Sequence, residues 1–468
     1  MIAVAVLVLA SAFASGQSDL RQRAVDTMRR AAEFYHGQVA SHGGYVYHYS
    51  LDLTQRWGEG MATKNQIWVQ PPGTPTVGLA YLQAYEATGD HFYLDAASDA
   101  AIALVYGQLK SGGWTNSIDF DPKSKFVADY RNNRGRGKNN SSLDDGQTQS
   151  AILLMVKADK ALGFKNQPIH QSAVIALDAL LRAQFPNGGF PQVWTGPVEE
   201  QPLIKASYPE YDWRTEGRIK NYWDMYTLND NVAGYVAKAL LAAHQVYDDQ
   251  KYLTALRKLG DFLLLAQMPD PQPGWAQQYS YDMKPIWARK FEPPGVSGDE
   301  TQEVIETLIK IVRATSDRKY LAPIPRAAAW LKSSLLPDGQ LARYYELKTN
   351  RPLYMTRRGD RYSLTYDDSK LPSHYGWKTE SRLEELGNQY TQLRSGDFSA
   401  QQPTSQQLAQ RAHQVIGLLD EQGRWVSTFD GERLVGQAKM PIGTKYLSSQ
   451  VFSDNLTALS DFIASSKR

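Results

Sequence analysis

The chain has 468 residues, with 51 Lys and Arg against 49 Asp and Glu, so its formal net charge is only +2. This balance gives no global attraction to nucleic acid or to an anionic surface, and any affinity for an acidic ligand has to be local. The absence of cysteine excludes disulfides, thiolate metal sites and a cysteine nucleophile. Eleven Trp and 27 Tyr suit either stacking on sugar rings or ordinary core packing.

An apolar run at the start of the chain covers residues 2–14 and ends in Ala12-Phe13-Ala14, a small-residue pattern typical of a cleavage site. The run is too short to span a bilayer. It predicts a secretory signal peptide over residues 1–16, although no basic residue precedes the run. We therefore expect a secreted or periplasmic protein that has no membrane attachment after cleavage.

A glycine followed by an aromatic or apolar residue recurs along the whole chain. The copies are Gly43-Gly44-Tyr45, Gly112-Gly113-Trp114, Gly188-Gly189-Phe190, Gly274-Trp275, Gly339-Gln340-Leu341 and Gly423-Arg424-Trp425. Each copy follows a segment of helical apolar periodicity, and most precede a second helix that starts with cap-forming residues. The predicted repeating unit is a helix, a Gly-aromatic strand, a long loop, a second helix and a tight turn.

Repeated helical hairpins of this kind predict a mainly α protein, an (α/α) toroid of about six hairpins with short Gly-aromatic strands in the loops. The repeat number favours a closed ring only weakly, because an open solenoid uses similar units. We expect residues 17–468 to form a single catalytic domain, with a surface linker at 395–406 and a closing hairpin at 407–468. In either architecture the loops collect at one end, where function is expected.

The loop after the second glycine pair carries four cations and no acid over residues 131–138. It is either a solvated loop or a rim that attracts an anionic polymer, and the sequence leaves both open. Directly after it, Asp144 and Asp145 stand at a predicted helix start, where capping and the helix dipole alone would favour acids. Their functional interpretation is a site for a hard cation such as Ca²⁺.

Four segments at equivalent places in the repeat carry a family resemblance. They are Asp144-Asp145-Gly146-Gln147-Thr148, Gly189-Phe190-Pro191-Gln192, Leu228-Asn229-Asp230 and Trp287-Ala288-Arg289-Lys290-Phe291-Glu292. Together and in this order they resemble the pectic acid lyases of polysaccharide lyase family 10, over residues 20–395. Asp145 replaces the Asn usual in that family, and Asn231 replaces a second Asp, which leaves the metal shell and the substrate preference open.

The resemblance implies a pectate lyase that cleaves polygalacturonate by β-elimination, in which a base removes the C5 proton and the 4-O-linked sugar leaves. That proton is barely acidic unless the uronate carboxylate is neutralised, which requires either a Ca²⁺ that bridges carboxylate and protein or a set of arginines. The resemblance implies Ca²⁺ as the cofactor. Asp144 and Asp230 match the family positions on the metal, and Arg289 matches the base. Because guanidinium is normally protonated, an arginine base implies activity in alkaline solution.

Six residues are predicted to bind the substrate: Asp230, Asn229, Trp287, Arg343, Arg357 and Tyr375. The guanidinium fork of Arg343 and Arg357 matches a carboxylate, and the competing interpretation of this arginine-rich stretch is a surface strand paired with its own acids. Tyr375 either stacks on a sugar or packs a loop. For Arg289, the alternative is packing on Trp287 and pairing with Glu292.

Two other functions fit the same architecture. A toroid glycoside hydrolase would use two carboxylates across the scissile bond and no metal. A non-catalytic glycan-binding protein would hold the polymer with aromatic and arginine side chains. We expect a monomeric lyase whose partner is polygalacturonate or a related acidic plant polysaccharide, and no binding of nucleic acid.

Overall fold

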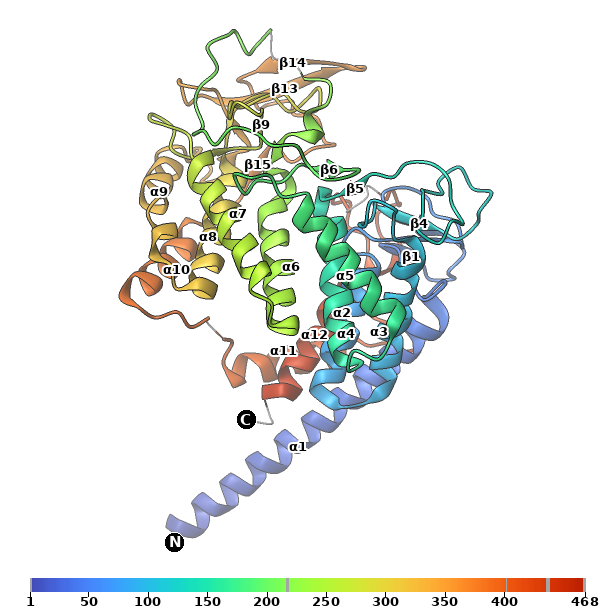
Figure 1. The fold of residues 1–468 in the computed structure, drawn as a ribbon. Helices are drawn as coiled ribbons and strands as arrows, with labels where there is room; N and C mark the ends of the chain where they lie inside the picture. The colour runs from blue at the N-terminus through green and yellow to red at the C-terminus, as the bar shows by residue number, and fades with distance from the viewer. Residues whose placement is uncertain (1, 216–218, 401, 435–437, 466–468) are drawn as a thin grey trace.

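A computed structural model shows that the chain alternates long helices with loops that carry short strands (Figure 1). The structure describes residues 2–215, 219–400, 402–434 and 438–465, with side chains from residue 18 onward. The α-helices are α1 (Ile2–Phe34), α2 (Thr74–Thr88), α3 (His91–Gly107), α4 (Gln147–Ala161), α5 (Gln167–Arg182), α6 (Val232–Tyr247), α7 (Gln250–Ala266), α8 (Gly298–Thr315), α9 (Ile324–Ser333), α10 (Leu383–Ser395), α11 (Ser405–Gly417) and α12 (Ser449–Ser465).

Consecutive helices pair into hairpins, from α1 and α2 to α11 and α12, and each hairpin contains one copy of the glycine motif. The second helices form an inner layer in which α12, α2, α4, α6, α8 and α10 follow one another in contact. The first helices pack outside them, as α3 does against α2 and α4, and α7 against α6 and α8. The (α/α) toroid predicted from the repeat is therefore confirmed.

The strands are short and lie in the loops between the helices of each hairpin. They are β1 (His48–Ser50), β2 (Arg56–Trp57), β3 (Gln66–Trp68), β4 (Ser117–Asp119), β5 (Ser141–Ser142), β6 (Val193–Trp194), β7 (Tyr226–Thr227), β8 (Trp275–Ala276), β9 (Gln278–Tyr279), β10 (Val296–Ser297), β11 (Leu341–Ala342), β12 (Tyr344–Tyr345), β13 (Pro352–Arg358), β14 (Arg361–Thr365), β15 (Lys378–Thr379), β16 (Val426–Thr428) and β17 (Lys445–Ser448). Figure 1 shows that strands β4 to β6, β9 and β13 to β15 lie toward the upper end, so these loops collect at one end of the helices.

The two ends of the chain meet in a four-stranded sheet of order β16-β17-β1-β2. Strand β17 runs antiparallel to β1, with Ser448 opposite His48, and α12 packs on α2. Beside this contact, the ring of Tyr35 stacks on Phe452 with centroids 3.9 Å apart. The last hairpin therefore packs directly on the first, as a closed ring requires.

The repeated glycines make the turn that leads from each first helix into the loop. Gly112 and Gly188 have φ of 97° and 94°, a left-handed conformation that a side chain disfavours. The second glycine of a pair allows close approach, since a Cβ on Gly113 would lie 2.7 Å from the Ser141 side-chain oxygen. Helices α3 and α5 have already ended, at Gly107 and Arg182, before these glycines are reached. The glycines therefore redirect the backbone, as predicted, but the prediction that they end the helices is wrong.

At the N-terminus, α1 runs without a break from the predicted signal segment into the first helix of the repeat. Cleavage after residue 16 stays a prediction, and Met1 lies outside the described residues. No helix in the described part of the chain has the length and apolar character needed to cross a membrane. Near the C-terminus, the stretch between α10 and α11 spans residues 396–404, inside the predicted linker, and Gln401 lies outside the described residues.

Candidate active site

Two inner helices begin with the same unusual backbone turn. The 3-10 turn Asp144–Gly146 precedes α4, and the 3-10 turn Asn229–Asn231 precedes α6. The middle residues, Asp145 and Asp230, have left-handed φ values of 44° and 50°. Asp and Asn tolerate this region better than other residues with side chains, because their short polar groups bond locally. The shared kink carries carboxylates from both helix starts to the space between them.

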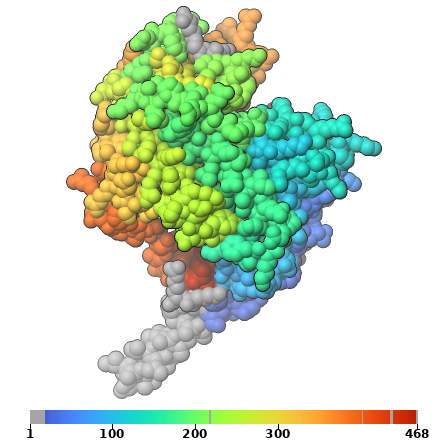
Figure 2. Space-filling model, viewed as in Figure 1, coloured from blue at the N-terminus to red at the C-terminus, as the bar shows by residue number. Residues whose placement is uncertain are grey.

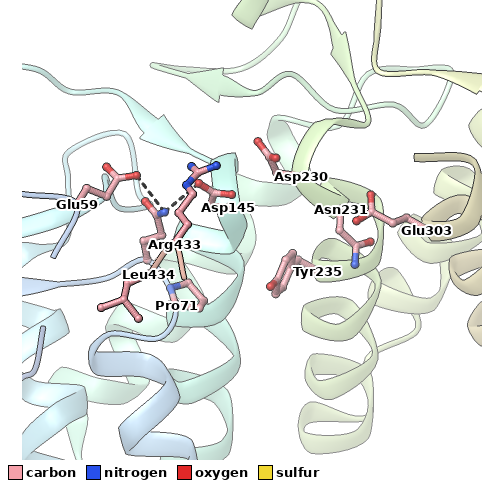
Figure 3. Close-up of a pocket in the computed structure, with 10 residues that line it drawn as sticks. Glu59, Pro71, Asp145, Asp230, Asn231, Tyr235, Glu303, Arg433 and Leu434 are labelled. Atoms are coloured by element: carbon pink, nitrogen blue, oxygen red, sulfur yellow. Dashed lines mark hydrogen bonds between the residues drawn. The ribbon is translucent and has the colours of Figure 1, made fainter. Parts of the chain in front are cut away.

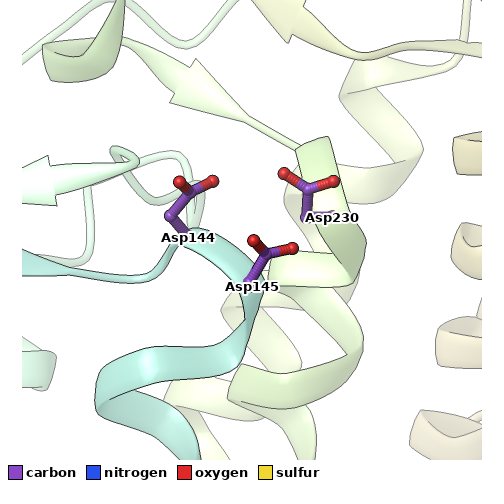
Figure 4. A group of neighbouring side chains, drawn as sticks. All are labelled: Asp144, Asp145 and Asp230. Atoms are coloured by element: carbon purple, nitrogen blue, oxygen red, sulfur yellow. The ribbon is translucent and has the colours of Figure 1, made fainter. Parts of the chain in front are cut away.

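Asp144, Asp145 and Asp230 form an acidic trio, whose ligand oxygens lie within 4.8 Å of one another (Figure 4). Burial, together with the charges of Asp144 and Glu59, raises the pKa of Asp145 to about 7. Burial and the other two members of the trio also raise the pKa of Asp230. Carboxylates that repel one another in a partly buried place suit a divalent hard cation, which would remove the repulsion. The three carboxylates therefore fit Ca²⁺ as ligands. They include Asp145 as well as the predicted metal ligands Asp144 and Asp230.

Side-chain amides orient the trio. Gln192 donates from Nε2 to Oδ1 of Asp144 at 2.7 Å, and Gln70 donates from Nε2 to Oδ2 of Asp145 at 2.9 Å. Gln70 also donates to Oε1 of Glu59 at 3.2 Å. At known metal sites, hydrogen bonds of this kind hold the ligating carboxylates in position.

The guanidinium of Arg343 places a fixed positive charge beside the trio. Its side chain is only 12% exposed and lies 3.0 Å from a Glu300 oxygen, 3.4 Å from Asp299 and 3.6 Å from Asp230. Burial lowers the pKa of Arg343, but Glu300 and neighbouring groups outweigh it and the pKa is raised well above its usual value. Arg343 therefore stays charged, and its charge favours ionised Asp230.

Arg289 faces the same space and is paired with a buried acid. Its guanidinium lies 2.5 Å from Oε1 of Glu292, which is 2% exposed and also accepts from Gln277 and Tyr375, each at 3.0 Å. Burial lowers the pKa of Arg289, but the bond and charge of Glu292 outweigh it, and the net pKa is raised. Arg289 in turn lowers the pKa values of Asp145 and Asp230, so its guanidinium acts on the trio. The trio, Arg343 and Arg289 together are called the active-site rim below.

The remaining predicted substrate residues occupy different environments. Tyr375 packs its ring 4.7 Å from the Arg343 guanidinium and 5.8 Å from that of Arg289, so it sits between the two arginines. Asn229 is 2% exposed, with its amide bonded to Asp230 and Gln277. Both positions support the rim, and direct contact of either residue with substrate stays a prediction.

Trp287 and Arg357 occupy two further environments. Trp287 is 8% exposed and donates its indole N–H to the Trp213 carbonyl at 2.7 Å, which favours a supporting role. Arg357 lies on the exposed hairpin of β13 and β14, with its guanidinium over the Tyr362 ring and 3.9 Å from Asp360. The surface-strand interpretation thus describes Arg357, while Arg343 lies at the site.

Several site residues were not singled out from the sequence, although the repeat contains a signal for some of them. The residue three positions after the second glycine is Asn116, Gln192 and Gln277 in successive copies, and the corresponding residue of the fifth copy is Arg343. All four bond acids or amides of this rim. A comparison of the copies position by position indicates the three amides, whereas Arg343 was already predicted to bind substrate. Glu59 and Glu300 carry no such signal.

A pocket of about 530 Å³ opens beside the trio and is lined by residues from separate repeats (Figure 3). Its charged lining residues are Glu59, Asp145, Asp230, Glu303 and Arg433. Four of these five are acids, so the lining of the pocket suits a cation.

Comparison with known proteins gives one family. The family model described as pectic acid lyase matches residues 108–341, which is half of the chain. None of the curated proteins matches the chain.

Solved structures with similar folds include enzymes of several kinds. A mutant family 10 polysaccharide lyase from Cellvibrio cellulosa, in complex with trigalacturonic acid, is 19% identical over 69% of this chain and 97% of that chain, with a TM-score of 0.47. A D-mannose isomerase is 14% identical over 95% of this chain and 97% of its own, with a TM-score of 0.49. A cellobiose 2-epimerase from Bacillus thermoamylovorans is 13% identical over 94% and 98%, with a TM-score of 0.48.

Proposed function

The chain belongs to the pectic acid lyase family and is a polysaccharide lyase, and from this premise we propose that it cleaves polygalacturonate by Ca²⁺-assisted β-elimination. We further propose that it acts outside the cell, with Arg289 as the base. The observation that carries the proposal is the single rim on which three clustered carboxylates meet two guanidinium groups. Such a rim is suited to a ligand that is itself an anion and is bound through a cation.

The acidic trio is the proposed metal site, with Asp144, Asp145 and Asp230 as ligands. Bound there, Ca²⁺ would neutralise the uronate carboxylate of the substrate and so make the neighbouring C5 proton more acidic. Gln192 and Gln70 keep two of the carboxylates in position. Arg343 favours the ionised form of Asp230, and its own charge is paired with Glu300.

Arg289 is the proposed base because its guanidinium is 40% exposed toward the same rim. In its neutral form it would take the proton from C5. The C5–H electrons would form the C4–C5 double bond, the C4–O bond would break, and the departing oxygen would be protonated by water. Glu292 opposes this role in the free protein by raising the pKa of Arg289. Positive charge close to Arg289 would lower the pKa of its guanidinium. We therefore expect the rate to rise into the alkaline range.

An assay of the purified protein on polygalacturonate tests this function. With Ca²⁺ present, ultraviolet absorbance from the new 4,5 double bond should grow with time, and a chelator should abolish it. Reducing ends that form without this absorbance would instead indicate a hydrolase. Binding of the polymer without either product would indicate a glycan-binding protein.

A further inference from the structure

A second groove, of about 590 Å³, opens on the far side of Glu59 from the acidic trio. Strands β3 and β4 contribute Gln66, Trp68 and Ser117 to its lining. One side is formed by residues 59–61, and the other by residues 125–128 and 136–138 of the loop after β4. Figure 1 shows this loop, coloured cyan to teal, projecting at the right of the molecule, and Figure 2 shows it as a bulge on the surface. The volume lies within the usual range of ligand pockets, about 300–1,000 Å³.

The groove is joined to the candidate active site through hydrogen bonds as well as through shared lining. Glu59 lines both spaces. It accepts from Asn116 Nδ2 at 3.2 Å on the groove side and from Gln70 Nε2 at 3.2 Å on the trio side. Gln70 continues to Asp145. The groove and the candidate active site are therefore neighbouring spaces that share Glu59 as a common wall.

The lining of the groove has the charge that an acidic polymer needs. Its cations are Lys125, Arg136 and Lys138, and Glu59 is its single acid. Among the residues that the structure describes, none of these three cations takes part in an ion pair. Their charges are thus available to an anionic ligand, in contrast to those of Arg289 and Arg343.

Exposed apolar side chains lie among these charges. Phe126 is 57% exposed and Met61 is 63% exposed, and the two come from opposite sides of the groove. Trp68 lines the groove with an indole N–H that has no hydrogen-bond partner in the described residues. Exposed apolar surface that is bordered by polar groups often marks a binding site, and sugar rings present both kinds of surface.

The cationic side of the groove is held in shape by its own backbone. A Cβ on Gly135 would lie 2.0 Å from the Ala128 carbonyl oxygen, so the two arms of the loop pack more closely than a side chain permits. The Asp129 N–H donates to the Lys138 carbonyl at 3.1 Å, and the Asp129 carboxylate pairs with Lys110 at 2.8 Å. This packing fixes the backbone that carries the cations, so less order has to be gained on binding.

We propose that this groove is a distal subsite, which binds a uronate unit of the same polymer several sugars away from the cleaved bond. The inference rests on the proposed function, since it assumes an acidic polysaccharide at the trio. Lys125, Arg136 and Lys138 contact the sugar carboxylate, and Phe126 and Met61 pack on the ring. Of the two interpretations left open for the cation-rich loop, the groove supports the rim that attracts an anionic polymer.

The test compares long and short substrates in the double variant Lys125→Ala/Lys138→Ala. The ratio of kcat/KM on polygalacturonate to kcat/KM on trigalacturonate should fall about tenfold, because two charged contacts reached only by the long chain are lost. Lys123→Ala is the matched control, since Lys123 is an exposed lysine of the same loop outside the groove lining. Its ratio should equal that of the wild type.

A second measurement removes turnover from the test. Titration calorimetry of polygalacturonate into Arg289→Ala protein, with and without the two lysine substitutions, should show weaker binding in the triple variant. An unchanged substrate ratio together with unchanged binding would overturn the distal subsite. A wild-type protein that forms no unsaturated product from either substrate would instead reject the proposed function, so the two failures are distinct.

Discussion

Asp145 and Asp230 occupy the same position in two successive hairpins, each in a left-handed turn immediately before an inner helix. The leucine two residues earlier donates its N–H to the carbonyl of a glutamine in the next hairpin, at 2.8 Å from Leu143 to Gln192 and at 2.9 Å from Leu228 to Gln277. The trio is thus built by repetition of one local structure. Its asymmetry comes from the preceding residue, which is the acid Asp144 in one turn and the amide Asn229 in the other.

The first prediction concerns stability without metal. The folded pKa of Asp145, about 7, exceeds its usual value of 3.8, so the folded state binds more protons between these values. Stability from this group therefore falls as pH rises from about 4 to about 7. Asp145→Asn should be more stable than the wild type in chelator at pH 8, by on the order of 2–4 kcal/mol, as measured by urea unfolding. Asp360→Asn, at a side chain that is 95% exposed, should have no effect.

The second prediction concerns the pH dependence of Ca²⁺ binding. Protonation of Asp145 competes with the metal, because a carboxylate has to be ionised to act as a ligand. The apparent Kd for Ca²⁺ should therefore rise about tenfold per pH unit below pH 7 and level off above it. Calorimetric titrations between pH 5.5 and 8.5 measure this trend. A Kd that stays constant over this range would show that Asp145 is not a ligand.

The third prediction concerns Arg289. Arg289→Ala should lower kcat by about 10²–10⁴-fold, the usual contribution of a general base, while the fold and the Ca²⁺ affinity are retained. Its melting temperature should be lower than that of the wild type, because the buried Glu292 loses its charged partner. Arg289→Lys should retain part of the activity with an optimum at lower pH, because the pKa of lysine is about 10.4. The neighbouring Lys290, whose Nζ bonds the Asp360 carbonyl on an exposed hairpin, provides the control Lys290→Ala. Full turnover in Arg289→Ala would remove this residue from the mechanism.

The fourth prediction concerns Glu292. Burial raises the pKa of Glu292, but hydrogen bonds and the charge of Arg289 outweigh it and the pKa is lowered. The stabilisation from this group is present above the usual glutamate pKa, near 4.5, and is lost as pH falls through the folded value. Glu292→Gln should therefore destabilise the protein at pH 8 by about 1–2 kcal/mol, since the partner Arg289 is partly solvated. Urea unfolding at pH 8 and pH 4 should show the difference shrinking at the lower pH.

How far the sequence predicts this protein depends on the range of the interaction involved. The glycine motif and its flanking periodicity predict the hairpins, because helix ends and turns are decided by nearby residues. The sequence does not predict that Glu292 would accept bonds from Gln277 and Tyr375, since these residues come from different loops. Burial of Trp287 is also a product of tertiary packing, and a motif cannot indicate which side of an aromatic ring will face solvent.

The sheet that joins β1 to β17 has a consequence for how the protein is made. Ser449 donates from Oγ to the Val46 carbonyl, a contact between residues 403 positions apart. During synthesis, the strand that completes the sheet of the first hairpin is translated about 400 residues after that hairpin. Until β17 has been translated, the edge of β1 has no β17 beside it, so the hairpin that carries Glu59 and Gln70 is completed long after its own synthesis.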